Sequence, residues 1–414
     1  MPYLRKEGVL CADDIPLSTI AAQVGTPCYI YCWSDIASRY QELDRALASV
    51  DARIRYAVKA NSNLEVLRRL VALGAGFDIV SGGELERVIR AGADPSDVVF
   101  SGVGKSHQEI SFALKAGIGC LNVESVAETY RIAEIAERLT ITAPVAIRVN
   151  PDIDVDTHPY IATGMRENKF GMPENDAFQL ATEIANDMPK LKFVGLACHI
   201  GSQLTEIEPY ADSLDALIEL RSLLLEEGIT CAVLDIGGGF GITYSDEEPF
   251  SFTDLGELIS QRRLQDIEVD VEPGRSLIGR AGVLLTRVEY LKPATRDGYL
   301  DFCIVDAAMN DLIRPALYEA FHDVEKVDNT DGEERDWNIV GPICETGDFL
   351  ATARPLAVQE GDLLAIRDVG AYGFVMSSNY NSRMRPAEVV VEGDSWTVAR
   401  RRESITDLLN LEQA

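Results

Sequence analysis

A lysine at the end of a strand-like run is the first residue whose position suggests chemistry. Residues 55–61 read RYAVKAN, and the apolar residues that follow recur at helical spacing from Leu64 onward. Lys59 therefore stands where a strand gives way to a helix, and in parallel α/β folds catalytic groups gather at the carboxyl ends of strands. A lysine shielded there can lose its proton and attack a carbonyl. Lys59 is a Schiff-base candidate, and an ordinary surface lysine is the alternative.

A run of glycines follows a later strand-like segment, because residues 235–241 read DIGGGFG. Without side chains, the backbone N–H groups of such a turn can surround an anion closely. In (β/α)8 barrels, phosphate sites commonly follow the seventh and eighth strands. A phosphate is the ligand we expect here, and a tight turn without a ligand is the alternative.

Two further segments offer groups that suit an aromatic, phosphorylated cofactor. Residues 272–275 read EPGR, and a carboxylate such as Glu272 beside a heterocyclic nitrogen keeps that nitrogen protonated. Arg275 offers a planar fork that matches a carboxylate. The ring of His199 can stack on a flat cofactor, and Ser202 can donate to a phosphate. Taken singly, these residues also suit surface ion pairs and structural hydrogen bonds.

The combination of these groups predicts one cofactor. A lysine for a Schiff base, a phosphate cradle, a carboxylate for a ring nitrogen and a flat ring for stacking are the four requirements of pyridoxal 5'-phosphate. All four occur at the ends of successive strand-like runs in this sequence. We therefore expect pyridoxal phosphate to bind at the rim where these strand ends meet.

Alternating strand-like and helical segments between about residues 34 and 280 predict the element order. The strands are expected at 53–59, 76–80, 97–101, 118–123, 143–149, 192–199, 231–236 and 267–272. The helices are expected at 63–73, 83–91, 107–116, 125–139, 175–187, 210–227 and 253–262. Eight successive βα units predict an N-terminal (β/α)8 TIM barrel over 34–280. An open doubly wound sheet is the alternative, but its glycine-rich turn usually follows the first strand.

After about residue 280 the apolar pattern has a period of two, which predicts a C-terminal antiparallel β domain. Strands are expected at 283–291, 300–305, 337–340, 349–358, 363–367, 388–391 and 396–400, and a short helix at 404–411. The β-prone run at 26–31 should pair with a distant strand, so that residues 1–33 complete the domain formed by 281–414. Within the barrel, the long loop at 150–171 is expected to be a lid or a binding element.

Composition limits the partners that we expect. The 414 residues include 38 Lys and Arg and 67 Asp and Glu, a formal net charge of −29 at pH 7. Such a chain repels phosphate backbones and anionic membranes, so neither nucleic acid nor a membrane is an expected partner. The sequence shows no basic and apolar leader and no membrane-spanning apolar run, which favours the cytoplasm. The eight cysteines lack CxxC spacing, so no metal site is predicted.

Several blocks of the sequence resemble the fold-type III pyridoxal-phosphate decarboxylases. These blocks are YAVKAN at 56–61, CHIGS at 198–202, GGGFG at 237–241 and EPGR at 272–275. Further blocks resemble the diaminopimelate decarboxylase branch of that family, namely MNDLIRPALY at 309–318, GPICETGD at 341–348 and GAYG at 370–373. The resemblance covers nearly the whole chain in order. It departs at Ala308, where the family often has glycine, and at Ser106, where threonine is commoner.

The resemblance implies roles for individual residues. Catalytic roles are implied for Lys59 as the Schiff-base lysine, His199 as the stacked ring, Glu272 beside the ring nitrogen and Cys344 as proton donor. Cofactor contacts are implied for Lys59, Asp78, His199, Ser202, Gly238, Gly239, Glu272, Pro273, Gly274, Arg275 and Tyr372. Substrate contacts are implied for Arg275, Arg314, Tyr318, Glu345 and Tyr372. The resemblance also implies a homodimer in which the cysteine loop reaches the partner's active site.

The activity that the resemblance implies is decarboxylation of meso-2,6-diaminopimelate to L-lysine and CO₂. A substrate whose far end is an amino acid needs a cationic fork and an anion, which Arg314 and Glu345 offer. The nearest alternative is a sister decarboxylase acting on another amino acid or on carboxynorspermidine. An amino-acid racemase of this fold would place a cation where Glu272 stands. A non-catalytic binding protein would not need both Lys59 and Cys344.

Overall fold

The computed structural model describes residues 2–153, 169–264, 266–296, 299–329 and 332–412, which fall into two compact units. One unit consists of Tyr40–Ile242 and Glu248–Ser276, and the other of Met1–Arg39, Thr243–Glu247 and Leu277–Ala414. Helix α2 (Trp33–Leu47) crosses both the first unit boundary and the domain boundary expected at residue 34. The domain limits of 34–280, and of 1–33 with 281–414, stay a proposal.

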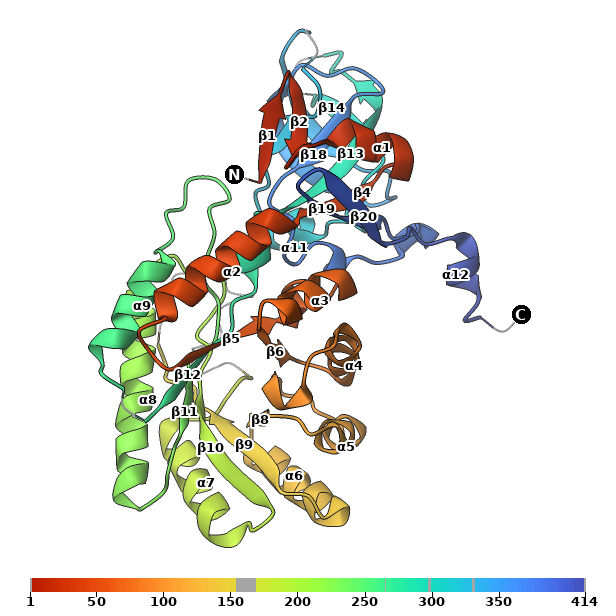
Figure 1. The fold of residues 1–414 in the computed structure, drawn as a ribbon. Coiled ribbons are helices and arrows are strands. Elements are labelled where there is room, and N and C mark those ends of the chain that lie inside the picture. The colour runs from red at the N-terminus through yellow and green to blue at the C-terminus, as the bar shows by residue number, and fades with distance from the viewer. Residues whose placement is uncertain (1, 154–168, 265, 297–298, 330–331, 413–414) are drawn as a thin grey trace. The chain divides into compact units, whose positions relative to one another are not determined.

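Within the described residues, the first unit is a closed barrel of eight parallel strands (Figure 1). Its strands are β5 (Ala52–Ala57), β6 (Gly76–Ile79), β7 (Val98–Phe100), β8 (Cys120–Val123), β9 (Ala143–Arg148), β10 (Leu191–Ala197), β11 (Val233–Asp235) and β12 (Glu268–Val271). The ring closes where β12 pairs with β5 and Val271 lies opposite Ile54. The predicted (β/α)8 barrel is confirmed, and ring closure excludes the open sheet.

Helices follow the barrel strands in the order that the sequence predicts. They are α3 (Leu64–Ala72), α4 (Gly82–Ala91), α5 (His107–Ala116), α6 (Val126–Leu139), α7 (Glu174–Asp187), α8 (Glu208–Glu226) and α9 (Phe252–Gln261). The periodic apolar residues of α3 are its buried face, formed by Val66, Leu67 and Leu70. Ser81 and Ser125 cap α4 and α6, because each hydroxyl accepts a backbone N–H from three residues on.

The second unit is built around a long strand, β13 (Gly282–Lys292). Its other strands in the large sheet are β4 (Cys28–Cys32), β14 (Phe302–Val305), β15 (Val324–Lys326), β16 (Arg335–Val340), β17 (Phe349–Leu356), β18 (Leu363–Ile366), β19 (Ala387–Glu392) and β20 (Ser395–Arg400). Strand β4 lies between β13 and β19, so the N-terminal run pairs with distant strands as predicted. Apolar residues of β4, β13 and β19 pack in one buried cluster.

The second unit differs in detail from the sequence prediction. Most strand pairs are antiparallel, but β4 pairs with β19 and β14 pairs with β16 in parallel. A long connection precedes each returning strand, which allows parallel pairing. Several short elements were not predicted, namely β1 (Tyr3–Lys6), β2 (Val9–Ala12), β3 (Ile15–Pro16), α1 (Leu17–Val24), α10 (Arg275–Ile278) and α11 (Arg314–Tyr318). The predicted C-terminal helix is α12 (Ile405–Leu409).

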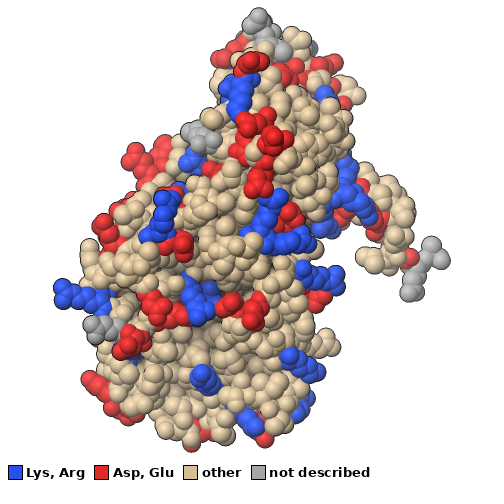
Figure 2. Space-filling model, in the orientation of Figure 1, with Lys and Arg blue, Asp and Glu red and all other residues tan. Residues whose placement is uncertain are grey.

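Charge is distributed over the surface without one dominant basic patch on the face in view. Figure 2 shows Asp and Glu side chains spread over this face, with Lys and Arg side chains standing among them. This interleaving gives many local ion pairs despite the net charge of −29. None of the helices in the described ranges combines the length and the apolar character that crossing a membrane requires.

Candidate active site

Lys59 lies at the carboxyl end of the first barrel strand. It is the central residue of a single 3-10 turn, η1 (Val58–Ala60), which follows β5 directly. Its Nζ atom donates to Oδ2 of Asp78, the third residue of β6, at 2.6 Å. Asp78 is fully buried, whereas the Lys59 side chain keeps 31% of its surface exposed. The ion pair thus holds an accessible amine at the mouth of the barrel.

Glu84 is a second acid near this amine, and the sequence analysis missed it. It lies in the first turn of α4, and its Oε2 atom accepts the N–H of Val80 at 2.6 Å. Burial raises the pKa of Glu84 to about 7, with a smaller contribution from the Asp78 charge. The signal was present in the sequence, because Ser81 followed three residues later by Glu84 is a helix-start pattern.

His199 follows β10 and is fixed by the glycine turn. The N–H of Gly238 donates to Nδ1 of His199 at 3.1 Å, so the proton of the neutral ring is assigned to Nε2. Burial, followed by the positive charges of Lys59 and Arg148, lowers the pKa of His199 well below 6.5. A neutral, oriented ring of this kind is suited to stacking on a flat ligand.

The glycines after β11 allow three loops to meet. A Cβ atom on Gly238 would lie 1.9 Å from the carbonyl oxygen of Glu272, and one on Gly239 would lie 2.1 Å from that of Gly201. Gly239 also has a φ of +92°, in the left-handed region that favours glycine. The close packing of these loops therefore requires glycine at both positions, whether or not a ligand binds. It also leaves their backbone free of side chains, as an anion cradle needs.

The EPGR segment after β12 joins the lysine turn and the serine loop. The N–H of Ala57 donates to the carbonyl of Pro273 at 3.0 Å. A Cβ atom on Gly274 would lie 3.0 Å from the Cβ of Ala60, so this glycine lets the two segments pack. Arg275 donates from Nη2 to the hydroxyl of Ser202 at 2.9 Å. Arg275 and Ser202 therefore form one polar group at the mouth.

Glu272 is the buried acid of this rim. Only 5% of its surface is exposed, and within the described ranges its Oε1 atom has no hydrogen-bond partner. Burial raises the pKa of Glu272 well above 4.5, and the charges of Asp235 and Asp78 add to the effect, while Lys59 opposes it. A buried oxygen without a donor costs free energy unless a ligand satisfies it.

Glu124 and Arg148 are further charged residues at this end of the barrel that the sequence analysis missed. Glu124 follows β8, and its Oε1 atom accepts from Arg148 at 2.8 Å and from the N–H of Gly102 at 2.9 Å. Its Oε2 atom accepts the N–H of Gly171 at 2.9 Å. These bonds tie together loops after three strands. The proposed lid at 150–171 lies largely outside the described residues, which omit 154–168.

The remaining predicted residues lie in the second unit and form two groups. In one, the Arg314 guanidinium lies 5.2 Å from the ring of Tyr244 and 5.8 Å from that of Tyr318, and its Nε atom contacts His322. Tyr372 has a left-handed backbone, with φ at +57°.

The second group surrounds Cys344, the exposed member of the eight cysteines. The N–H of Cys344 donates to Oδ1 of Asn381 at 2.9 Å. Oε2 of Glu345 accepts from the hydroxyl of Tyr380 at 3.0 Å. Burial raises the pKa of other thiols, such as Cys120 and Cys198, to about 12. Cys344 is therefore the thiol best placed to exchange protons with a ligand.

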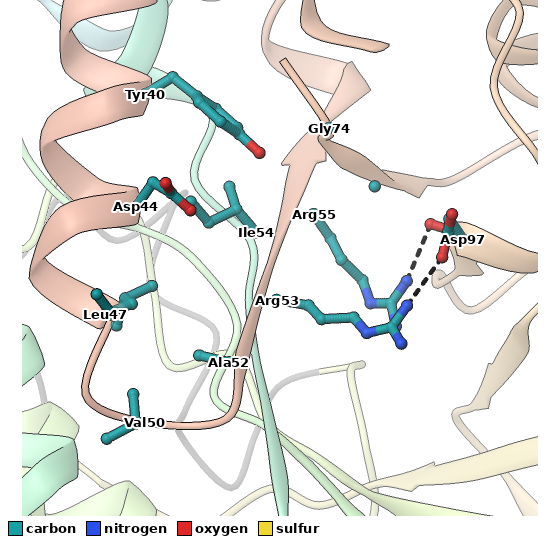
Figure 3. A pocket seen from close by; sticks show the side chains of 12 residues that line it. Tyr40, Asp44, Leu47, Val50, Ala52, Arg53, Ile54, Arg55, Gly74 and Asp97 are labelled. Carbon is teal, nitrogen blue, oxygen red and sulfur yellow. Dashed lines mark hydrogen bonds and ion pairs between the residues drawn. The ribbon is translucent and has the colours of Figure 1, made fainter. Parts of the chain in front are cut away.

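A hollow of about 340 Å³ lies at the opposite, amino-terminal end of the barrel strands (Figure 3). Its lining residues are Tyr40, Asp44, Leu47, Ala48, Val50, Ala52, Arg53, Ile54, Arg55, Gly74, Gly76 and Asp97. Arg53 and Arg55 both reach Asp97, through its carboxylate at 2.9 Å and its carbonyl oxygen at 2.9 Å respectively. The lysine, histidine and glutamate of the predicted site lie at the other end.

The carboxyl-terminal mouth fits pyridoxal phosphate. Its groups match in kind, because it has an accessible amine, a neutral imidazole, an open glycine turn and a hydroxyl beside a guanidinium. The open Oε1 atom of Glu272 is the most specific feature, since a protonated ring nitrogen would supply the donor that this buried oxygen lacks. The amine of Lys59 suits the aldehyde of the same cofactor.

Comparisons with known proteins agree with this geometry. A family profile described as "Pyridoxal-dependent decarboxylase, pyridoxal binding domain" matches residues 33–279. Diaminopimelate decarboxylase of Pseudomonas aeruginosa is 52% identical over 407 residues, which cover 98% of this chain and 97% of that protein. The enzyme of the same name from Vibrio cholerae is 48% identical, with 99% and 97% covered.

Solved structures show the same fold over nearly the full length. Diaminopimelate decarboxylase of Helicobacter pylori complexed with L-lysine has a TM-score of 0.91 at 40% identity, covering 95% of this chain and 98% of that one. The M. jannaschii enzyme in co-complex with L-lysine has a TM-score of 0.93 at 35% identity, with 100% and 98% covered. This chain therefore belongs to the pyridoxal-dependent decarboxylases and, within them, to the diaminopimelate decarboxylase family.

Proposed function

We propose that this protein decarboxylates meso-2,6-diaminopimelate to L-lysine and CO₂ with pyridoxal 5'-phosphate. The observation that carries the proposal is the single mouth at which an accessible Lys59 amine, a neutral His199 ring and the open Oε1 of Glu272 meet. The choice of substrate is supported by the name shared with relatives about 50% identical over nearly the full length, and by L-lysine in two related structures.

Residues of the barrel unit would hold the cofactor. When bound, pyridoxal phosphate supplies an aldehyde for the lysine amine and a ring that withdraws electrons from the reacting carbon. Glu272 would accept a hydrogen bond from the ring nitrogen, and His199 would pack on the ring. The phosphate contacts proposed in this unit are Ser202, Gly238, Gly239 and the backbone of 272–275, and Tyr372 is a further contact proposed from the second unit. Asp78 holds the Lys59 amine at the mouth.

Residues of the second unit would bind the substrate. Arg314 is buried among aromatic rings that fix its guanidinium, and such a fork matches the distant carboxylate. Glu345 offers a negative charge for the distant ammonium group. The further substrate contacts that we propose from the family resemblance are Tyr318 and Tyr372 of the second unit and Arg275 of the barrel unit.

Cys344 would return a proton to the α-carbon after CO₂ leaves. Its thiol is exposed, whereas the other cysteines of the chain are buried. The proposed assembly is a homodimer in which the Cys344 loop of one subunit completes the active site of the other, and the proposed location is the cytoplasm.

A substrate panel tests the proposal. Purified protein loaded with pyridoxal phosphate is given meso-diaminopimelate, ornithine, arginine, lysine and carboxynorspermidine, and CO₂ and the amine products are measured. We expect turnover of diaminopimelate to L-lysine to exceed the others by at least about 10²-fold, because a site built for two charged ends rejects substrates that lack one. Faster turnover of carboxynorspermidine or another amino acid would assign the protein to a sister activity.

A further inference from the structure

His322 is a buried histidine beside Arg314, and the proposed function gives it no role. It lies in the segment that follows α11, and its exposed fraction is 1%, against 7% for Arg314. The Nε atom of Arg314 donates to Nε2 of His322 at 3.3 Å. Nδ1 of the same ring lies 2.9 Å from the carbonyl oxygen of Arg367, which follows β18. One imidazole therefore connects the guanidinium to the backbone of a neighbouring segment.

The two contacts of this ring fix its protonation. A carbonyl oxygen can only accept a hydrogen bond, so Nδ1 of His322 carries the proton and donates it to Arg367. A guanidinium can only donate, so Nε2 is unprotonated and accepts from Arg314. The ring is therefore neutral, with its proton on Nδ1. A second proton would set an N–H of the ring against the N–H of Arg314 and place two positive charges together in a buried site, which costs free energy.

Neighbouring groups hold both side chains in place. The ring of Tyr244 meets the His322 ring edge to face, with centroids 5.4 Å apart and planes at 88°. The guanidinium of Arg314 lies 5.2 Å from the centroid of the same Tyr244 ring. The backbone of His322 is held separately, because Nη2 of Arg354 on β17 donates to its carbonyl oxygen at 3.1 Å. The imidazole is thus fixed at several points, so its Nε2 atom can set the orientation of the guanidinium.

The bond to His322 also decides which edge of Arg314 is presented to a carboxylate. A guanidinium offers a carboxylate two parallel N–H groups, either Nε with one Nη or the two Nη groups together. Because Nε donates to His322, the paired contact falls to the edge formed by Nη1 and Nη2. We propose that His322 is a positioning residue for substrate binding, whose neutral ring directs this edge of Arg314 to the carboxylate at the distant end of the substrate. The inference rests on the proposed function, in which Arg314 binds that carboxylate.

Two amide substitutions separate the two bonds of the ring. In His322→Asn the amide nitrogen takes the place of Nδ1, so a donor for the Arg367 carbonyl remains and the acceptor for Arg314 is lost. In His322→Gln the amide oxygen takes the place of Nε2, so the acceptor for Arg314 remains and the donor is lost. A purely structural histidine depends on the backbone bond, and a positioning histidine depends on the bond to Arg314. The two roles therefore give opposite orders for the two variants.

The test uses L-lysine and cadaverine, which have the same carbon chain and two amino groups, although only L-lysine has a carboxylate. Their dissociation constants are measured by calorimetry for the cofactor-loaded wild-type protein and both variants. We expect the wild-type protein to prefer L-lysine. His322→Asn should weaken L-lysine binding by about 10-fold and leave cadaverine binding unchanged, because a misdirected guanidinium affects only the ligand with a carboxylate. His322→Gln should keep most of the preference.

Two outcomes would overturn the proposal, namely an unchanged preference in His322→Asn or an equal or larger loss in His322→Gln. Equal binding of L-lysine and cadaverine by the wild-type protein would instead count against the carboxylate contact of Arg314 in the proposed function. Steady-state rates with meso-diaminopimelate give a second readout. His322→Asn should raise KM more than it lowers kcat, because a contact made equally in the ground and transition states changes only binding. A fall in kcat at unchanged KM would contradict the positioning role.

A further measurement needs no variant and so does not depend on the folding of one. Nitrogen chemical shifts of the histidine rings report which ring nitrogen carries the proton, and the chain has four histidines. We expect a neutral ring with its proton on Nδ1, the opposite of the form assigned to His199, whose Nδ1 atom accepts from Gly238. A wild-type spectrum in which no histidine shows the Nδ1–H form would overturn the proposal.

Discussion

The two ends of the barrel differ in how their charged side chains are paired. At the amino-terminal end, Arg53 bonds to Glu268 at 2.6 Å and to Asp97 at 2.9 Å, and Arg55 bonds to Asp270 at 2.6 Å. At the carboxyl-terminal end, one oxygen each of Asp78 and Glu272 has no donor within the described ranges, and at the amino-terminal end Oδ1 of Asp270 shares that lack. The arginines of the amino-terminal end are bonded to carboxylates, whereas Glu272 at the other end leaves an acceptor for a ligand.

This difference separates stability from function within one fold. A cation matched to a carboxylate fixes the strands that bear them, and removing either partner leaves an uncompensated charge. A buried acceptor without a donor lowers the stability of the fold. Proteins retain such acceptors at sites where a bound ligand supplies the missing donor. Lys59 and the glycine turn lie at the end where Asp78 and Glu272 have oxygens without a donor among the described residues, so the electrostatics and the motifs point to the same mouth.

The largest effect is expected from removing the amine. Lys59→Ala should lower decarboxylation by at least about 10³-fold, because it removes the amine that we propose attaches the aldehyde covalently. Lys190→Ala, which removes a partly exposed lysine near Glu137, should leave activity unchanged.

Borohydride reduction followed by peptide mass mapping gives the readout for this prediction. The pyridoxyl adduct should appear on the peptide that contains Lys59 and be absent from the Lys59→Ala protein. An adduct on any other lysine of a fully loaded sample would show that Lys59 is not the residue that binds the cofactor covalently.

At the opposite end, a stability effect is expected in place of a catalytic one. Arg55→Met should lower the free energy of unfolding by about 3–5 kcal/mol, since it leaves Asp270 buried without its guanidinium. Arg53→Met is the matched control, and because the Arg53 side chain is 50% exposed its effect should be at most about 1 kcal/mol. Chemical denaturation measures both.

The pH dependence of the Arg55→Met effect sharpens this prediction. The pKa of Asp270 is raised to about 7 by burial, and the Arg55 charge opposes that rise. Without Arg55 the pKa rises further, so a proton can replace the missing cation below pH 7 but not well above it. The loss of stability should therefore be larger at pH 8 than at pH 6. Equal losses at both pH values would mean that Asp270 does not depend on Arg55.

The sequence predicted the barrel better than it predicted the second unit. In the barrel, a short apolar run that marks a strand is followed by apolar residues at helical spacing, as in α3. The change from one pattern to the other is visible in the sequence. Strand β1 does not alternate, since one buried residue is followed by three exposed ones, and helix α1 begins after Pro16 without a side-chain cap, so neither gives a clear local signal. The parallel pairing of β4 with β19 depends on residues some 360 positions apart, which no local pattern encodes.

The same limit applies to the site. Lys59, His199 and Glu272 each stand in a distinctive local motif, so sequence reasoning found them. Glu124, which the sequence analysis missed, bonds to Arg148 on the neighbouring strand, and only the register of β8 against β9 brings the two side chains together. Residues that serve a site through another side chain therefore need the register of the strands to be known.

Charge removal at the functional end should affect catalysis more than folding. Glu272→Gln should lower kcat by about 10²-fold, because the amide keeps the shape of the side chain but cannot carry the negative charge that we propose keeps the ring nitrogen protonated. Glu268→Gln is the matched change at the opposite end and should leave kcat unchanged. Steady-state rates for the two variants, each checked for cofactor content, test the comparison. Similar losses of kcat in both variants would contradict the proposal that only the carboxyl-terminal end serves catalysis.

The smallest effect concerns Glu84, whose buried carboxyl titrates near neutral pH. Its pKa is raised from 4.5 to about 7 in the folded protein, so folded molecules retain a proton that unfolded ones lose between these values. Stability from this group is fully present below pH 4.5 and is lost as the pH rises through 7. Glu84→Gln removes the titration and should flatten the decline in unfolding free energy between pH 5 and 8 by ~1 kcal/mol. Denaturant unfolding measured across this pH range tests the prediction, and Glu86→Gln, a change at an exposed glutamate, is the control. If Glu84 were ionised throughout, Glu84→Gln would not change the slope of unfolding free energy against pH. Because Glu84 bonds to the Val80 N–H beside the Lys59 and Asp78 pair, a flattened slope would place an acid that is neutral below about pH 7 next to the amine.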